Sequence, residues 1–251
     1  MKRQWNPQTA KIVFFDMNNT LIDPKSSFDS CFLSVLVDFT GRWDHSEGDW
    51  NPQRVLDTYR SAWTKKAKLL ARKPRELEEA KKQCLEAALH RYPFQVNDAF
   101  VSSFFREMKR QVRAHAVPFP DAGGTLAALS ETHTIGIITN GSKEHQRKVI
   151  ARLNWSSYIR SEHLISSDQA GSRKPDPAIF RLAVRSAAIR PQEGVMVGDS
   201  WKNDIEGAVK SGMNAVWLNR SETKKSSRQA GNVNVPVVRS LTELKERLTG
   251  K

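Results

Sequence analysis

The chain has 251 residues, of which 39% are hydrophobic and 27% are charged, a balance typical of a globular protein with a sizeable core. Its 40 Lys and Arg residues outnumber its 27 Asp and Glu residues, giving a net charge of +13. No apolar run approaches the roughly 18 residues that a membrane-spanning helix needs, and two cysteines cannot form a disulfide framework. We therefore expect a protein of the reducing cytoplasm, neither a membrane protein nor a disulfide-rich secreted scaffold.

Short apolar runs predict a series of strands. The first covers residues 11–15, where four apolar residues in a row suggest a strand buried on both faces. Similar runs predict strands at 134–138, 195–197 and 215–218, with weaker candidates at 164–165 and 235–238. Helical patterns lie between them, at 124–130, 143–153, 177–188, 204–211 and 241–248. This alternation predicts an α/β fold with a doubly wound parallel sheet.

Residues 24–115 show a different pattern, without a convincing strand. Helical patterns cover 27–39, 52–71, 74–90 and 98–114. In the third of these, apolar residues recur at spacings of three and four, as on the buried face of a helical bundle. We therefore expect an all-helical domain at 24–115, inserted into an α/β core domain made of 1–23 and 116–251. The polar, basic stretch 221–234 is typical of a mobile loop.

The positive charge is spread along the chain rather than concentrated in one segment. The densest basic stretches are 65–68 and 72–75, and such runs usually form a solvated helix face. No nucleic-acid-binding motif accompanies them, so a nucleic-acid partner is not favoured. The sequence indicates no oligomeric state.

Polar and reactive side chains follow the ends of predicted strands or precede helices. They form four groups: Asp16-Met17-Asn18-Asn19-Thr20, Thr139-Asn140-Gly141-Ser142, Arg173-Lys174-Pro175-Asp176-Pro177, and Gly198-Asp199-Ser200-Trp201-Lys202-Asn203-Asp204. In an open parallel sheet, ligands bind beyond the carboxyl ends of the strands. The residue types suit phosphoryl transfer: a carboxylate can attack phosphorus, another can help to hold Mg²⁺, and Lys and Thr can bind the transferring oxygens. The helix start after Gly141 would offer backbone N–H groups to an anion.

These four motifs, in this order and with a helical insertion after the first, resemble the haloacid dehalogenase (HAD) superfamily over nearly the whole chain. The resemblance implies a Rossmann-like HAD-type core, a helical cap domain of the C1 type, and hydrolase chemistry with Mg²⁺. It implies the following roles: Asp16 as nucleophile and metal ligand, Asn18 as a metal ligand through its backbone carbonyl, Thr139 and Asn140 as substrate-binding residues, Lys174 as the lysine that steadies Asp16 and the phosphate, and Asp199 and Asp204 as metal-binding acids. Those two acids separate the family's phosphatases from its metal-free dehalogenases, so phosphate chemistry is expected.

Asn18 departs from the pattern, because the family's phosphatases place an Asp two residues after the nucleophile. That Asp protonates the leaving oxygen and then helps to deprotonate the attacking water. An amide can do neither, which removes a contribution of roughly 10²–10⁴-fold in rate. Three interpretations follow: hydrolysis of acyl or aryl phosphates, whose leaving groups need no proton; a long-lived aspartyl-phosphate passed to an acceptor; or a weak or inactive relative. Asp23 or a residue of the helical cap could act as a replacement acid, but the sequence does not point to either.

The expected function is that of a Mg²⁺-dependent phosphatase acting on a small phosphorylated metabolite through an aspartyl-phosphate on Asp16. Suitable substrates are a sugar phosphate, a nucleoside monophosphate or a compound like flavin mononucleotide, and the sequence does not choose between them. The alternative is a catalytically weak or inactive protein of this fold that binds a phosphate ligand or a partner. Asn18 favours that alternative, and the intact residues of the other motifs disfavour it.

Overall fold

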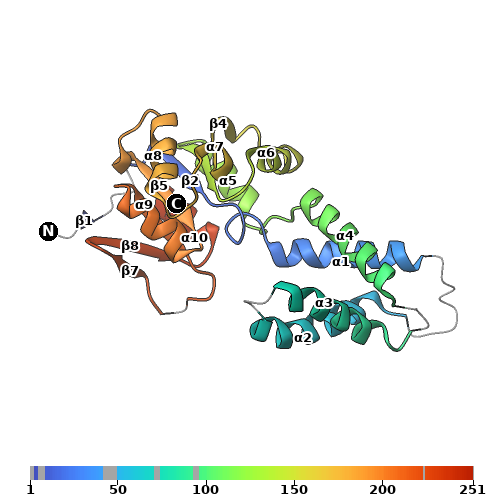
Figure 1. Cartoon of the computed structure of the whole chain (residues 1–251). Helices are drawn as coiled ribbons and strands as arrows, with labels where there is room; N and C mark the ends of the chain where they lie inside the picture. Colours follow the sequence, from blue (N-terminus) through green and yellow to red (C-terminus); the bar gives the residue numbers. More distant parts are fainter. Residues whose placement is uncertain are drawn as a thin grey trace. The chain divides into compact units, whose positions relative to one another are not determined.

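A computed structural model describes residues 3–4, 9–41, 50–70, 74–92, 96–222 and 224–250. The chain forms two compact units: the first consists of Met1–Pro24 and Ala116–Lys251, and the second of Lys25–His115. Every strand that the structure describes belongs to the first unit, whereas the second, which we call the helical unit, contains four long helices (Figure 1). None of the described helices has the length and apolar character needed to span a membrane.

The first unit is built on a sheet of eight described strands. At its centre, β2 (Ile12–Phe15) pairs in parallel with β3 (Thr134–Thr139) on one side and with β5 (Gly194–Gly198) on the other. The order along the sheet is β1-β8-β6-β5-β2-β3-β4, and β7 pairs with β8 in the antiparallel direction. The other strands are β1 (Arg3–Gln4), β4 (Ile159–Ser166), β6 (Asn214–Leu218), β7 (Ser227–Ala230) and β8 (Val233–Val238). The predicted α/β class and parallel sheet are confirmed.

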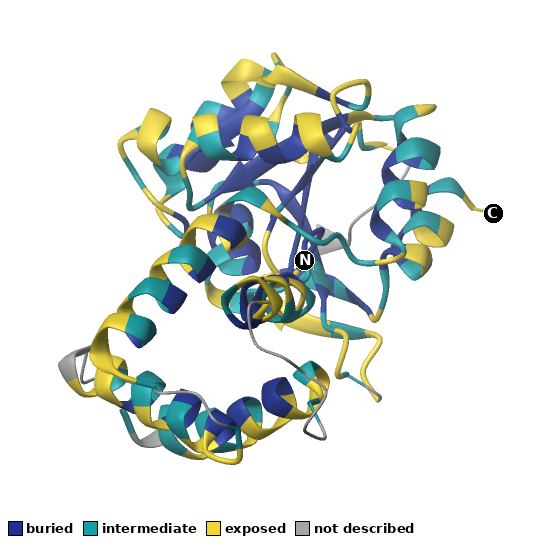
Figure 2. Ribbon diagram, turned by 90° about the vertical axis from the view of Figure 1, so that its right-hand side faces the viewer, coloured by how far each residue is buried: buried dark blue, intermediate teal, exposed yellow. Residues whose placement is uncertain are grey.

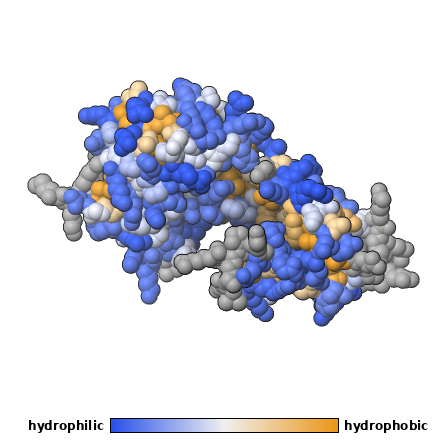
Figure 3. Space-filling view, in the orientation of Figure 1, coloured by the Kyte–Doolittle hydropathy of each residue, from blue (hydrophilic) through white to orange (hydrophobic). Residues whose placement is uncertain are grey.

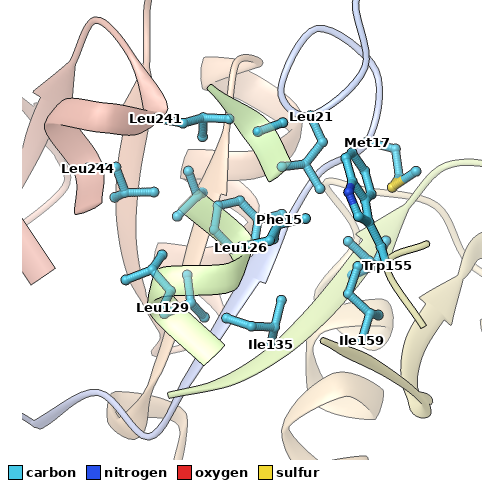
Figure 4. Packing of buried hydrophobic residues seen from close by; sticks show 14 of the residues in the cluster. Phe15, Met17, Leu21, Leu126, Leu129, Ile135, Trp155, Ile159, Leu241 and Leu244 are labelled. Atoms are coloured by element: carbon cyan, nitrogen blue, oxygen red, sulfur yellow. The ribbon is translucent and has the colours of Figure 1, made fainter. Parts of the chain in front are cut away.

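Alternate residues of β2 pack into two separate hydrophobic clusters, one on each face of the sheet. Val13 and Phe15 belong to the cluster formed with α5 (Ala122–Ser130), α6 (Lys143–Arg152) and α10 (Leu241–Thr249). Figure 4 shows Phe15 beside Leu126 in this cluster. Ile12 and Phe14 belong to the other, formed with α8 (Pro177–Ser186) and α9 (Gly207–Lys210). Burial on both faces explains the uninterrupted apolar strands, which are dark blue in Figure 2.

Several elements differ from those predicted. The stretch 221–234, predicted to be a mobile loop, contains β7 and the start of β8, so that prediction is wrong; Thr223 lies outside the described residues. Residues 227–230 carry no strand pattern of their own, and they form β7 because they pair with β8. The helix predicted at 204–211 is a π-helical segment, Trp201–Glu206, followed by α9. Three further short elements were not predicted: β1, α7 (Ser167–Ala170) and a 3₁₀ helix at Pro191–Glu193.

The helical unit consists of α1 (Pro24–Thr40), α2 (Pro52–Leu70), α3 (Pro74–Leu89) and α4 (Asp98–Ala114). Its core is aromatic: the buried rings of Phe32 and Phe104 meet edge to face, with centroids 5.2 Å apart. A cavity of about 1260 Å³ opens beside this core. On the face of the helical unit that is visible in Figure 3, several hydrophobic side chains are exposed to view. Ala71, predicted as the end of a helix, and the basic residues Arg72 and Lys73 lie outside the described residues.

The chain leaves and re-enters the first unit through two segments that are hydrogen-bonded to each other. The Asp23 N–H donates to the Val117 carbonyl at 2.9 Å, and the Phe119 N–H donates to the Leu21 carbonyl at 2.9 Å. Ile22 forms an antiparallel bridge with Pro118 between them. The outgoing and returning segments therefore run side by side as a short ribbon.

Candidate active site

Three of the predicted site residues lie at the ends of three neighbouring strands. Asp16 follows β2, Thr139 is the last residue of β3, and Asp199 follows β5. The N–H of Asp16 donates to the Val197 carbonyl of β5 at 2.9 Å, which fixes the chain where it leaves the sheet. Because parallel strands bring their carboxyl ends to one edge, a local sequence feature of each strand becomes part of one site.

Lys174, from the loop before α8, connects the acids of this site. Its Nζ lies 2.5 Å from Asp16 Oδ1 and 2.7 Å from Asp204 Oδ1, and it donates to the Ile138 carbonyl at 2.7 Å. The side chain is only 2% exposed. Burial opposes the positive charge, but the two adjacent carboxylates outweigh it and raise the pKa of the Lys174 ammonium. The lysine is therefore a buried cation held between two acids.

Asp16, Asp199 and Asp204 form a cluster of carboxylates that suits a divalent cation. One oxygen from each lies within 4.8 Å of the others. Oxygens on one Mg²⁺ lie up to about 4.2 Å apart, because each bond is about 2.1 Å long, so small side-chain adjustments would complete such a site. Asp204 is buried, and its Oδ1 lies 2.7 Å from the Lys174 ammonium, so the three acids offer only oxygen atoms, the donors that Mg²⁺ prefers. The donor set therefore fits Mg²⁺.

Burial also changes the protonation of the two acids that follow β5. It raises the pKa of the Asp199 carboxyl, with a further increase from the nearby Asp16 carboxylate. It raises the pKa of Asp204 to about 6, although the Lys174 ammonium acts in the opposite direction. A bound divalent cation would remove this penalty, because it favours the charged carboxylates.

Asn140 holds the main chain of Lys174 with both ends of its amide. Its Oδ1 accepts a hydrogen bond from the Lys174 N–H at 2.7 Å, and its Nδ2 donates to the Lys174 carbonyl at 3.0 Å. The side chain of Asn140 thus positions the lysine, and its predicted contact with substrate stays a prediction. The neighbouring Thr139 is buried, and a side chain at Gly141 would come within 3.6 Å of its hydroxyl.

Asn18 lies in a tight turn just after Asp16. Asn19 has a positive φ of 60°, a conformation that asparagine adopts more readily than most residues. The Asn19 N–H donates to the Ile22 carbonyl at 2.8 Å, and the Ile22 N–H donates to the Met17 carbonyl at 2.8 Å. Asn18 is exposed on this turn, two residues from the carboxylate cluster, and its side chain carries no ionisable group.

The start of α6 differs from the expectation that its N–H groups would be offered to an anion. The Lys143 N–H donates to the Asp168 carboxylate, 3.2 Å from Oδ1 and 3.1 Å from Oδ2. The His145 N–H donates to the Ser142 hydroxyl at 3.5 Å. These two amides are therefore used within the protein, one by a carboxylate 25 residues away in the chain and the other by the capping hydroxyl of Ser142.

Other residues that shape the site were not predicted. The Ser200 N–H donates to Asp204 Oδ2 at 3.0 Å, and the Trp217 indole N–H donates to the Asp199 carbonyl at 2.8 Å. A side-chain carbon at Gly198 would lie 2.4 Å from the Asp204 carboxylate. The adjacency of Gly198 and Asp199 was a usable signal, whereas nothing in the sequence marked Trp217.

Comparisons with known proteins identify the fold and the family. A family model described as a haloacid dehalogenase-like hydrolase matches residues 10–212. Glyceraldehyde 3-phosphate phosphatase from Methanothermobacter thermautotrophicus is 32% identical over 134 residues, which are 52% of this chain and 58% of the relative. The enzyme of the same name from Pyrococcus abyssi is 29% identical over 83% of this chain and 81% of its own length. The match to the first relative thus spans little more than half of that protein.

Solved structures show the same architecture. The HAD-hydrolase YfnB from Bacillus subtilis has a TM-score of 0.60 to this chain at 18% identity, over 96% of this chain and 99% of that one. Such a likeness concerns the fold alone. The family model, by contrast, spans most of the chain and includes all four motif groups. The chain therefore belongs to the haloacid dehalogenase-like hydrolases.

Proposed function

We propose that this hydrolase is a Mg²⁺-dependent phosphatase that cleaves small phosphomonoesters through an aspartyl-phosphate on Asp16. The observation that carries the proposal is the position of Asp16. Its carboxylate stands at the end of the central strand, 2.5 Å from the Lys174 ammonium and beside Asp199 and Asp204. The relatives named glyceraldehyde 3-phosphate phosphatase support a small phosphorylated metabolite as the substrate.

In the proposed first step, an Asp16 oxygen bonds to phosphorus as the bond from phosphorus to the ester oxygen breaks. The leaving oxygen departs with that electron pair and takes a proton from water to become the alcohol. Lys174 and the Thr139 hydroxyl bind oxygens of the transferring group, and Asn140 keeps Lys174 in place. Mg²⁺ held by Asp16, the Asn18 carbonyl, Asp199 and Asp204 would neutralise phosphate charge. Water then attacks the phosphorus, which releases inorganic phosphate and restores the carboxylate.

Asn18 directs the proposal toward substrates with good leaving groups. An alkoxide must take up a proton as it leaves, whereas an acyl or aryl phosphate releases a stable anion without one. The same residue supports the second candidate function, a weakly active or inactive protein that binds phosphate compounds. The two differ in whether inorganic phosphate is released.

The proposal includes the organisation and location of the protein. Residues 1–23 and 116–251 would be the catalytic core, and 24–115 a cap domain whose side chains select the substrate. Cys31 and Cys84 are free, buried thiols, which suits the reducing cytoplasm.

A hydrolysis panel tests the function directly. The purified chain is given acetyl phosphate, an aryl phosphate, glyceraldehyde 3-phosphate, sugar phosphates and nucleoside monophosphates, with Mg²⁺ or with a chelator, and the released phosphate is measured. We expect release that needs Mg²⁺ and that the Asp16→Asn variant loses. Glu131→Gln, which changes an exposed carboxylate in the same unit, serves as the matched control and should retain the activity.

Three results would contradict the proposal. Equal phosphate release by Asp16→Asn would exclude Asp16 as the nucleophile, and full activity with the chelator would exclude the metal. If no substrate is hydrolysed but the same compounds raise the melting temperature, the binding protein is the better description.

A further inference from the structure

Two tryptophans hold the segment that follows β5 at both of its ends. Trp217 of β6 is the ladder partner of Gly198, and its indole N–H donates to the carbonyl of the next residue, Asp199, at 2.8 Å. The indole N–H of Trp201 donates to Glu206 Oε1 at 2.9 Å. This second bond spans the π-helical segment Trp201–Glu206, which carries Asp204.

The two indoles also pack on each other, and an arginine packs on both. Their ring centroids are 5.1 Å apart, with an interplanar angle of 69°. The guanidinium carbon of Arg228 lies 4.0 Å from the centroid of the Trp201 ring and 5.2 Å from that of Trp217. Arg228 forms no ion pair with any residue that the structure describes, so the indoles are its main contact.

Arg228 belongs to a strand that is distant in the sequence from the segment after β5. It lies on β7, where it pairs with Val235 of β8, and Figure 1 shows these two strands side by side. Trp217 belongs to β6, which pairs with both β5 and β8. The contact therefore ties the β7–β8 hairpin, through two aromatic rings, to the segment after β5.

We propose that Arg228, Trp201 and Trp217 act as positioning residues that fix the main chain of Asp199 to Glu206 and thereby set the affinity of the Asp199–Asp204 site for a divalent cation. The Asp199 carbonyl held by Trp217 orients the residue whose carboxylate joins the cluster. Removal of a residue that hydrogen-bonds to a metal ligand typically changes the affinity for the metal about 10–100-fold. The inference rests on the proposed function, because it assumes a cation at that site.

A purely structural cluster would behave differently. Loss of indole packing would then lower the melting temperature of the metal-free protein and leave its affinity for Mg²⁺ unchanged. A positioning cluster instead changes the affinity by more than the loss of stability explains. The two alternatives are separated by measuring Mg²⁺ binding and metal-free stability on the same variants.

The experiment uses the full chain and Mg²⁺ alone as the probe, with calorimetric titration and thermal unfolding as readouts. Trp217→Phe keeps an aromatic ring but removes the N–H donor to Asp199, and we expect about tenfold weaker Mg²⁺ binding. Arg228→Ala removes the cation from both rings, and we expect about threefold weaker binding. Arg228→Lys keeps the charge without the planar face and should fall between Arg228→Ala and the wild type.

Gln229→Ala is the matched control, because Gln229 is the next residue on β7 and its side chain contacts Asn234 rather than the indoles. It should bind Mg²⁺ as the wild type does. Wild-type affinity in both Trp217→Phe and Arg228→Ala would overturn the inference while leaving the proposed function intact. A wild-type protein that binds no Mg²⁺ would instead overturn the metal assignment of the proposed function, and the inference with it.

Discussion

A single missing side chain allows the acids of the site to come together. A Cβ atom at Gly198 would lie 2.4 Å from the carboxylate of Asp204, closer than side-chain carbons are found in proteins. Glycine at the last position of β5 therefore leaves space for the buried carboxylate of Asp204, which belongs to the π-helical segment and packs against the end of this strand. The requirement is steric and does not depend on the conformational freedom of glycine.

At Asn18, restoring a carboxylic acid should restore proton transfer to the leaving group. We expect Asn18→Asp to increase the turnover of an alkyl phosphate several-fold or more, because general acid catalysis contributes roughly 10²–10⁴-fold where it operates. Acetyl phosphate, whose leaving group needs no proton, should gain less, because a carboxylate at position 18 would help only the later attack of water. Steady-state kinetics on both substrates measure the difference.

Asn19→Asp provides the control for this substitution, because it adds the same charge one residue further along the same exposed turn. An increase common to both variants would point to a general electrostatic effect. An unchanged or lower rate in a folded Asn18→Asp protein would show that another group already transfers the proton.

The sequence predicted which residues meet at the site, but not how each is used. Asp16 and Asp199 each end an apolar run, so their meeting at one edge follows from the parallel sheet. The bond from Asn140 to the main chain of Lys174 could not be predicted, because the two residues are 34 positions apart in the chain; a contact between Asn140 and substrate stays a prediction. The hydrogen bond from the first N–H of α6 to the Asp168 carboxylate could not be predicted for the same reason, because long-range hydrogen bonds leave no local pattern in the sequence.

Among the elements, those with a strong pattern of their own were predicted well. The central strands were found because burial on both faces demands uninterrupted apolar residues. In the same way, Asp176 and Pro177 marked the start of α8, where the Asp176 side chain accepts the Ala178 N–H at 2.8 Å. β7, with the sequence Ser-Arg-Gln-Ala, was missed because its strand conformation depends on its partner β8.

Glu193 joins the amino ends of the two central strands β2 and β5. Its carboxylate accepts the Arg190 N–H at 2.8 Å and lies 2.9 Å from the Lys11 Nζ, while its carbonyl accepts the Lys11 N–H at 2.8 Å. The Arg190 side chain and N–H, together with Lys11, lower the pKa of Glu193 from 4.5 to about 2. The charged form is thus favoured by the folded state.

This shift predicts how stability depends on pH. A carboxyl with a lowered folded-state pKa stabilises the protein fully above its unfolded value of 4.5, and the contribution is lost as the pH falls toward 2. The melting-temperature difference between the wild type and Glu193→Gln should therefore be largest above pH 4.5 and shrink below it. Thermal unfolding at a series of pH values, with Glu131→Gln as control, measures it. A difference that is constant with pH would exclude the ion pair as its cause.

At the scale of the whole molecule, the chain divides where its sequence pattern changes. The units separate between Pro24 and Lys25 and between His115 and Ala116, close to the two ends of the run of helical patterns. Both parts have a net positive charge, so neither alone accounts for the total of +13. Among the residues that the structure describes, each unit has its own hydrophobic core, with two clusters in the first and one in the second.

The paired segments at the boundary predict that the first unit can fold without the helical one. Because the Asp23 N–H bonds to the Val117 carbonyl, residues 24–116 can be replaced by a two-residue Asn-Gly turn of the kind that closes hairpins. We expect this variant to unfold cooperatively and to be stabilised by Mg²⁺, as we also expect of the full chain, while losing selectivity among phosphomonoesters. Circular dichroism melts with and without Mg²⁺ test the folding.

Full-length Asp204→Asn is a suitable comparison, since it keeps the helical unit but loses a proposed metal ligand. It should remain folded and lose the stabilisation by Mg²⁺. A shortened variant without a cooperative transition would show that the first unit needs the helical one in order to fold.

The ribbon formed by residues 21–23 and 117–119 has a further consequence for how such a protein can diversify. Because the inserted helical unit begins and ends at adjacent backbone atoms, an insertion of another length or shape can be joined to the first unit at the same place without rearranging it. Mutations in the helical unit can then accumulate without moving the strand ends that carry Asp16 and Asp199. Under the proposed function, in which the helical unit selects the substrate, new substrate preferences can arise through changes in that unit alone, while the residues at the sheet edge stay the same.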